Sequence, residues 1–129
     1  MADPRFIGVD IAYAVHDRQL AEHGGLAGIE DAGLLESALG RPLNKHGYDE
    51  DDLCALAAAY AFGIVRNHPF NDGNKRTAWV MARLFLRLND VTIAFDKADA
   101  IRTMLALASG ELDETALADW FRRHIVQPK

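Results

Sequence analysis

Residues 73–88 read Gly-Asn-Lys-Arg-Thr-Ala-Trp-Val-Met-Ala-Arg-Leu-Phe-Leu-Arg-Leu, and this stretch sets the fold class that we expect. Its apolar residues surround most of a helix, which is typical of a helix inside a protein. Arg76, Arg83 and Arg87 are offset by 7 and 11 residues and therefore return to one narrow stripe. The stretch predicts a buried central helix with a single basic edge.

Apolar residues recur at helical rather than alternating spacing in most of the remaining chain, so the predicted class is all-α with six helices. Residues 91–95 are expected to form a short extended stretch. The other five helices are expected at Val9–Glu22, at Asp31–Leu39, from Asp51 or Asp52 to Asn67, from the N-cap Asp96 to Ala108, and after the N-cap Asp113 with Leu117, Trp120, Phe121 and Ile125 on the last one.

Glycine and proline mark where these helices are expected to end. Gly24 and Gly25 tolerate positive φ and end the first helix. Gly40 and Pro42 are expected to end the second, because a proline disfavours helical backbone at the residue before it. Pro69 limits the third helix in the same way.

The chain of 129 residues, half of them apolar, fits one domain over residues 1–129. The single cysteine, Cys54, cannot form an internal disulfide, and no apolar run approaches the length of a membrane span. We therefore expect a cytoplasmic protein without membrane contact. A net charge of −5 also disfavours a general nucleic-acid binder, although residues 66–87 alone carry +4.

The segment Arg66-Asn-His-Pro-Phe-Asn-Asp-Gly-Asn-Lys-Arg76 is the densest cluster of polar and ionisable groups in the chain. Gly73 permits a tight turn, and the first N–H groups of the following helix are unpaired and carry partial positive charge. Lys75 and Arg76 add full charges in the first helical turn. The segment predicts an anion-binding helix N-terminus.

Two residues of this segment suggest a reaction in addition to binding. His68 carries the side chain best suited to proton transfer at neutral pH. Asp72 could hold Mg²⁺, which binds one or two carboxylates together with nucleotide phosphates. A base, a metal carboxylate and a phosphate site together describe phosphoryl or nucleotidyl transfer to a hydroxyl.

Purely structural roles remain open for the same residues. Asp72 or Asn71 could be the N-cap of the central helix, and His68 a packed loop histidine. Arg83 and Arg87 fit surface charges that interact with the helix dipole. Surface or core positions are expected for the remaining histidines, which lack metal-ligand spacing: His16, His23, His46 and His124.

Residues 68–76, His-Pro-Phe-Asn-Asp-Gly-Asn-Lys-Arg, resemble the core signature of the Fic/Doc family. The Asn-Lys-Arg ending resembles the death-on-curing (Doc) branch, in which Lys replaces a glycine of Fic proteins. Residues 24–42 are similar to the amino-terminal segment of Doc-like toxins, so the likeness covers about Val9 to Trp120. The resemblance implies a compact all-α fold in which the motif loop leads into the central helix.

The resemblance also implies a toxin of a type II toxin–antitoxin pair that transfers the γ-phosphate of ATP to a protein hydroxyl. The target that the resemblance implies is a threonine of translation elongation factor Tu, whose modification would inhibit translation. Carried over by position, His68 would deprotonate the hydroxyl and Asp72 would act in catalysis and hold the metal. The implied phosphate and nucleotide binders are Asn74, Lys75, Arg76, the backbone of Gly73 and, as a match to a Doc arginine, Arg66.

Two departures from AMP-transferring Fic proteins bear on the reaction. Lys75 stands where those proteins have glycine, and Trp79 stands where they have a second arginine for the triphosphate. Both favour a serine/threonine kinase over an AMP transferase. No glutamate has Ser or Thr four positions before it, as the inhibitory helix of many Fic proteins requires, so we expect silencing by an antitoxin acting in trans.

Three other functions remain as alternatives. The first is AMP transfer of the Fic type. The second is a metal-dependent nuclease in which His68 activates water, although the acidic balance of the chain counts against it. The third is a catalytically silent module that kept the nucleotide or phosphate site.

Overall fold

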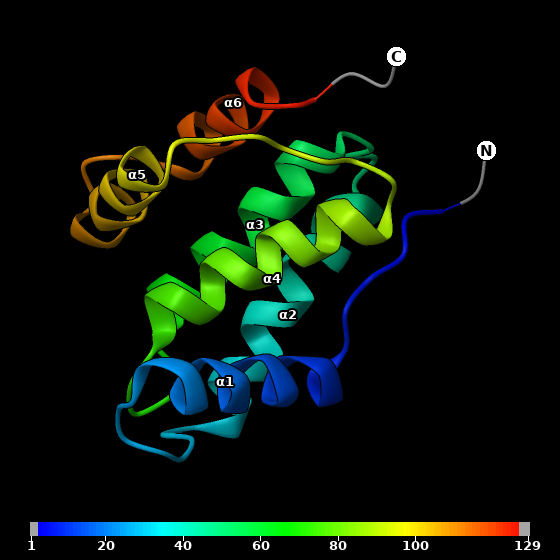
Figure 1. Cartoon of the computed structure of the whole chain (residues 1–129). Coiled ribbons are helices and arrows are strands. Elements are labelled where there is room, and N and C mark those ends of the chain that lie inside the picture. The colour runs from blue at the N-terminus through cyan, green and yellow to red at the C-terminus, as the bar shows by residue number, and fades with distance from the viewer. Residues whose placement is uncertain (1–2, 127–129) are drawn as a thin grey trace.

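The computed structural model describes residues 3–126, which form six α-helices and no β-strand (Figure 1). The predicted all-α class is therefore confirmed. No helix among these residues is both long and apolar enough to cross a membrane. The helices are α1 (Val9–His23), α2 (Ala32–Gly47), α3 (Leu53–Asn67), α4 (Asn74–Leu88), α5 (Lys97–Ser109) and α6 (Glu114–Arg123).

The middle of the molecule is the contact between α3 and α4 (Figure 1). Helix α3 also packs against α2 and α6, while α1 packs against α4. Helix α3 is buried on nearly every side from Cys54 to Ile64, as its run of alanines allows. Helix α4 is central as expected, but it buries only one face, including Ala78, Met81 and Phe85, and its basic edge stays exposed.

Short polar side chains and glycines set most helix ends where the sequence predicts them. The carboxylates of Asp52, Asp96 and Asp113 accept hydrogen bonds from main-chain N–H groups of the first turns of α3, α5 and α6. Gly24 and Gly110 follow α1 and α5 with φ of 76° and 85°, conformations that suit glycine. Pro69 likewise lies just beyond the end of α3.

The predicted end of α2 at Leu39 is wrong, because the helix continues through Gly40 and Pro42 to Gly47. A proline at position 42 removes the hydrogen bond that the carbonyl of Ala38 would accept. That carbonyl lies against Gly63 of α3, where a Cβ atom would stand only 3.0 Å from it. The fully buried Pro42 ring and the close packing on α3 compensate for the missing bond.

An ion-pair cluster ties the second half of α2 to α6. Glu114, whose side chain is 11% exposed, lies 2.6 Å from both the Arg41 Nε and the Lys45 Nζ. These partners lie on the part of α2 that the sequence did not predict as helix. The contact with Glu114 therefore holds the second half of α2 in place in spite of Pro42.

The predicted placement of Ile125 on the last helix is also wrong, because α6 ends at Arg123 and Ile125 pairs with Ile93 in an isolated β-bridge. The Ala94 N–H donates to the His124 carbonyl (2.9 Å), and the Val126 N–H donates to the Thr92 carbonyl (2.8 Å). The extended stretch expected at residues 91–95 is thus satisfied by the chain that follows α6.

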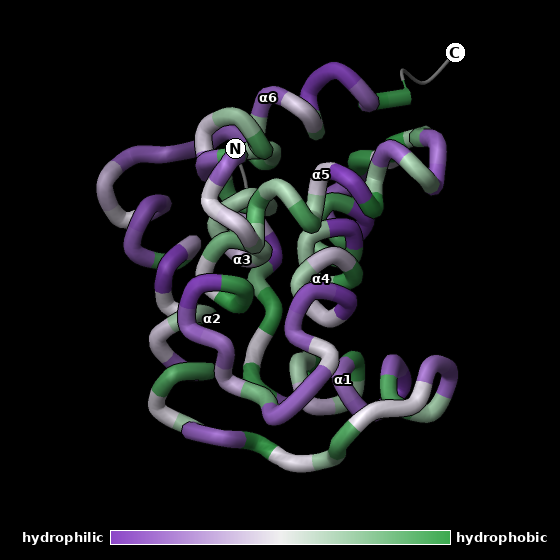
Figure 2. Tube along the Cα trace, turned by 90° about the vertical axis from the view of Figure 1, so that its left-hand side faces the viewer, coloured by the Kyte–Doolittle hydropathy of each residue, from purple (hydrophilic) through white to green (hydrophobic). Residues whose placement is uncertain are grey.

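The connection between α1 and α2 runs along one end of the molecule (Figure 2). It meets the loop between α3 and α4 through a bridge between Ile29 and Phe70. The N–H of Glu30 donates to the Pro69 carbonyl (2.7 Å), and the N–H of Asn71 donates to the Gly28 carbonyl (3.1 Å). The motif loop is therefore hydrogen-bonded to a segment that lies about forty residues earlier in the sequence.

Candidate active site

His68 begins the motif loop in the left-handed conformation, with φ 51° and ψ 56°. Its N–H donates to the Ile64 carbonyl (2.9 Å) and so closes α3. A left-handed non-glycine residue costs about 1–2 kcal/mol. The result is an abrupt turn that leaves 61% of the His68 side chain exposed, where it can meet an external substrate.

Glu30, on the connection between α1 and α2, is the acidic neighbour of this histidine. Its Oε2 lies 3.8 Å from the His68 Nδ1. This separation is too long for a hydrogen bond, and neither ring nitrogen of His68 forms one within residues 3–126. Glu30 was not singled out in the sequence, because nothing in its own neighbourhood relates it to His68.

Asn74 fixes the inside of the loop. Its Oδ1 accepts a hydrogen bond from the Phe70 N–H (3.1 Å), and its Nδ2 donates to the Phe70 carbonyl (2.9 Å). The residue is 5% exposed, and Phe70 is fully buried. Because the Asn74 amide is committed to the loop, its main-chain N–H is the group it can offer to a phosphate.

Asp72 faces solvent with both carboxylate oxygens already oriented. Oδ2 accepts from the Leu26 N–H (3.1 Å), and Oδ1 accepts from the Gly73 N–H (2.8 Å). The hydrogen bond from Leu26 is the main cause that lowers the pKa of Asp72 below its usual value, and the hydrogen bond from Gly73 is the next. The carboxylate is therefore ionised at neutral pH, and each oxygen keeps a lone pair for a cation.

Neither Asp72 nor Asn71 is the N-cap of α4, so this structural alternative is wrong. The N-cap is Gly73, with φ 77° and no side-chain hydrogen bond. Asn71 instead donates from Nδ2 to the Ala27 carbonyl (3.1 Å), because the loop pairs with the connection between α1 and α2. The first turn of α4 is thus left without a side-chain cap.

Lys75 and Arg76 stand at this uncapped end of α4, and both are exposed. Within residues 3–126, neither has a carboxylate within 4.0 Å, and the main-chain N–H groups of residues 74–76 have no hydrogen-bond partner. Unpaired N–H groups, the helix dipole and two cations are the features of a helix end that can bind an anion. The described part of the chain has no cluster of three metal-binding side chains, so a Mg²⁺ ion would rely on Asp72 and on the phosphates of a substrate.

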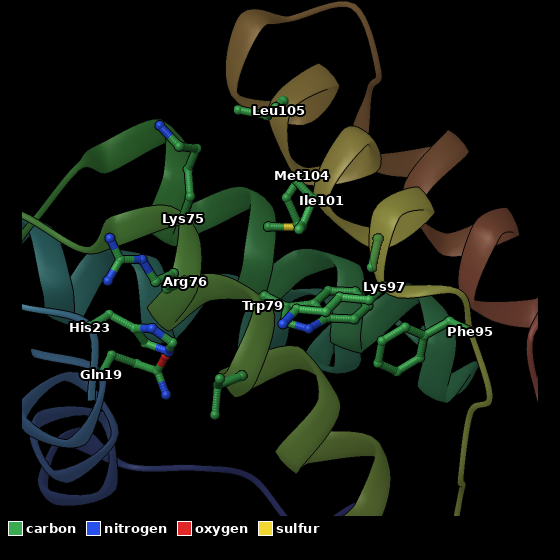
Figure 3. A pocket seen from close by; sticks show the side chains of 12 residues that line it. Gln19, His23, Lys75, Arg76, Trp79, Phe95, Lys97, Ile101, Met104 and Leu105 are labelled. Atoms are coloured by element: carbon green, nitrogen blue, oxygen red, sulfur yellow. The ribbon is translucent and has the colours of Figure 1, made fainter. Parts of the chain in front are cut away.

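Beside this site lies a groove of about 410 Å³ between α1, α4 and α5 (Figure 3). Lys75 and Arg76 line one end, and Ile101, Met104 and Leu105 of α5 line the opposite wall. Trp79 lies between them, with its ring edge-on to Phe95 at 5.0 Å between centroids. Trp79 therefore contributes apolar surface to this groove and no charge.

The other arginines of the basic segment lie away from the loop. The guanidinium of Arg66 is 5.9 Å from the ring centroid of Phe62 on α3, and no hydrogen bond or ion pair joins it to the loop within the described residues. Arg83 lies over Phe95 at 4.9 Å, and partial burial of its guanidinium, followed by neighbouring Arg87, lowers its pKa although the residue as a whole is exposed. Arg83 and Arg87 are exposed, as expected for surface charges.

The sequence predicts a surface or core position for His16 of α1, and the structure places it in the core, where it supports the loop from inside. Its ring stacks on Phe70 with centroids 3.8 Å apart, and its Nε2 lies 2.9 Å from the Asp72 main-chain oxygen. The available signal was weak: Ala12, His16 and Gln19 recur at the spacing of an inward helix face, and all three are buried.

Known proteins resemble this chain over most of its length. The family model described as "Fic/DOC family" matches residues 6–86. A protein of Escherichia phage P1 named "Protein kinase doc" is 38% identical over 92% of this chain and 94% of its own length. A protein of Mycolicibacterium smegmatis named "Toxin Doc" is 38% identical over 72% of this chain and 76% of its own length.

Proposed function

The chain belongs to the Fic/DOC family, and we propose that it is a toxin of a type II toxin–antitoxin pair that transfers the γ-phosphate of ATP to a protein hydroxyl. One observation carries the proposal: an uncapped helix end with Lys75 and Arg76 lies directly after an exposed His68 and an ionised Asp72. The printed names of the two relatives, a protein kinase and a toxin, support it.

In the proposed reaction His68 is the general base. Its ring takes the proton of the target hydroxyl while the hydroxyl oxygen forms a bond to the γ-phosphorus of ATP. The bond from that phosphorus to the β–γ bridging oxygen breaks, and ADP leaves with the electron pair. The exposure of His68 supports this role, because the hydroxyl belongs to another protein and must reach the ring from solvent.

The phosphates would be held by the N-terminal end of α4. The main-chain N–H groups of residues 74–76 would donate to phosphate oxygens, Arg76 would bind two oxygens at once, and Lys75 would add a point charge. Asp72 would hold Mg²⁺, which when bound neutralises charge on the phosphates. The hydrogen bonds that orient the Asp72 carboxylate would keep it in place for that role.

Lys75 and Trp79 favour transfer of the γ-phosphate over transfer of AMP. Lys75 carries a long side chain at the helix end, where the glycine of AMP-transferring relatives would leave more room for phosphate. Trp79 supplies an aromatic wall of the groove where AMP-transferring relatives would use an arginine. AMP transfer remains the second candidate, because the rest of the site would serve either reaction.

An antitoxin acting in trans would occupy the groove between α1, α4 and α5. Ile101 and Leu105 on its wall are each 52% exposed, and apolar surface of this kind is characteristic of a binding site. Lys75 and Arg76 at one end have no carboxylate partner in the described chain. An amphipathic antitoxin segment with an acidic residue there would cover the apolar wall and compete with phosphate.

The test is incubation of the protein with translation elongation factor Tu, Mg²⁺ and ATP labelled at either the α- or the γ-phosphate. We expect label from the γ position alone, on a threonine, and none with His68→Ala. His46→Ala is the matched control, because His46 lies on α2 and bonds to the Glu50 carbonyl, away from the loop. Wild-type transfer by the His68 variant would overturn the mechanism.

The same experiment separates the alternatives. Label from the α position would identify an AMP transferase in spite of Lys75 and Trp79. Binding of ATP without transfer to any target, unchanged by His68→Ala, would identify a silent binding module. Cleavage of RNA without ATP would identify a nuclease.

A further inference from the structure

His16 holds the motif loop by two contacts of different kinds. Its ring stacks on Phe70 with planes only 7° apart, and its Nε2 lies 2.9 Å from the main-chain oxygen of Asp72. Because a carbonyl oxygen only accepts, Nε2 carries the hydrogen and donates it. His16 is 2% exposed, so this donor is buried together with the stack.

The peptide that His16 holds is the point where the loop becomes α4. At Gly73 the chain turns with φ 77°, and a Cβ atom there would lie 3.7 Å from Leu20 and 3.8 Å from the His16 ring. The turn therefore rests directly on α1. Asp72 is held at three atoms: its carbonyl by His16, its Oδ2 by Leu26 and its Oδ1 by Gly73.

A histidine is not the residue that packing alone would favour at this place. A phenylalanine ring would stack on Phe70 equally well, and an unpaired buried polar group would destabilise the core. The one feature that a histidine adds is the Nε2–H donor. Its acceptor belongs to the residue whose carboxylate lies beside the anion site.

We propose that His16 is a positioning residue of the active site. Its Nε2–H fixes the Asp72–Gly73 peptide and thereby sets the direction of the Asp72 carboxylate and of the first N–H groups of α4. The kinetic consequence rests on the proposed phosphoryl transfer, whereas the hold on the loop does not. A misplacement of about 1 Å at such a site costs on the order of 100-fold in rate.

Two substitutions separate the donor from the stack. His16→Phe keeps the ring against Phe70 and removes the donor, so we expect kcat to fall about 10- to 100-fold. His16→Gln removes the ring and keeps an N–H near the place of Nε2, so we expect it to retain kcat within about 3-fold. Tyr13→Leu is the control for packing, because Tyr13 contacts Phe70 edge-on at 6.3 Å and makes no bond to Asp72.

Melting temperatures of the three variants are measured alongside kcat. If His16 acted only through packing, kcat would follow stability, and His16→Gln would be impaired at least as much as His16→Phe. That order of effects, or wild-type kcat in His16→Phe, would overturn the proposal.

Nuclear magnetic resonance tests the hold on the loop without any transfer reaction. We expect protonated Nε2 on His16 in the wild type, and faster hydrogen exchange at the Leu26 and Gly73 amides in His16→Phe but not in His16→Gln. Unchanged amides in His16→Phe would overturn the proposal whatever the activity. If the amides respond while the wild type transfers no phosphate, the proposed function fails and the positioning role of His16 stands.

Discussion

The two ends of α4 carry similar side chains in opposite electrostatic surroundings. Lys75 and Arg76 lie in its first turn, whereas Arg87 lies in its last. The helix dipole favours cations at the C-terminal end and opposes them at the N-terminal end. Arg87 therefore stabilises the helix, while Lys75 and Arg76 act against it and form no ion pair with a carboxylate among residues 3–126.

This difference shows which basic residues the fold explains and which require a ligand. The fold accounts for Arg83 through the aromatic ring of Phe95 and for Arg87 through the helix end. It does not account for a lysine and an arginine placed where unpaired N–H groups already attract anions. This placement supports the proposal that the site binds an external phosphate.

The largest expected difference between the two ends is in activity. Arg76→Ala should lower phosphoryl transfer about 10²- to 10³-fold, because it removes a preorganised donor from the transferring phosphate. Arg87→Ala should leave transfer within about 2-fold, since its charge is screened at that distance along α4. Initial rates with labelled ATP measure both, and an equal loss in the two variants would contradict the comparison.

A pair of asparagines gives the next largest effect, on stability. Asn74 closes two hydrogen bonds on the main chain of Phe70, and Asn89 does the same on Arg5 at the other end of α4. The Phe70 groups are buried, so Asn74→Ala should cost about 2–3 kcal/mol, because it leaves them unpaired. Asn89→Ala should cost about 1 kcal/mol, because water can replace its bonds. Urea unfolding measures both, and a larger loss at Asn89 would be evidence against this account.

Much of the fold was predictable because single residues fix local structure. The caps Asp52, Asp96 and Asp113 and the end at Gly24 act within a few residues of the chain, and each stands where the sequence predicts it. The end of α2 was not predictable in this way. Pro42 is tolerated because Gly63, more than twenty positions away, allows the two helices to approach.

The same division applies to the site. The motif residues from His68 to Arg76 could be identified from their chemistry and adjacency. Glu30 and His16 could not, because their relation to the motif exists only through tertiary contacts. The side chain of Asn74 reads as a phosphate ligand in the sequence, but the buried main chain of Phe70 takes both its polar atoms.

The Asp72 carboxylate makes the stability of the chain depend on pH. Hydrogen bonds from Leu26 and Gly73 lower the pKa of Asp72, so its charge contributes stability above the unfolded pKa of about 3.9 and loses that contribution as the pH falls through the folded pKa. Asp72→Asn should therefore be less stable than the wild type near neutral pH, with the difference shrinking below about pH 4. Asp90→Asn at the opposite end of α4 is the control, because the Asp90 carboxylate accepts no hydrogen bond from the described chain. Melting curves from pH 3 to 7 provide the measurement, and a gap that widens at low pH would contradict the sign.

The smallest expected effect is on stability, and it tests directly the opposite influence of the helix dipole on Lys75 and on Arg87. Glutamine removes the charge of lysine or arginine at little cost in helix propensity. Lys75→Gln should raise the free energy of unfolding by about 0.3–0.5 kcal/mol, and Arg87→Gln should lower it by a similar amount. Both changes should fade in 1 M salt, where the screening length falls to about 3 Å. If the two variants change the free energy of unfolding in opposite directions at low salt, and both changes vanish at high salt, the helix dipole opposes Lys75 and favours Arg87. If both variants are less stable than the wild type, Lys75 stabilises the fold as Arg87 does, and the contrast between the two helix ends is wrong.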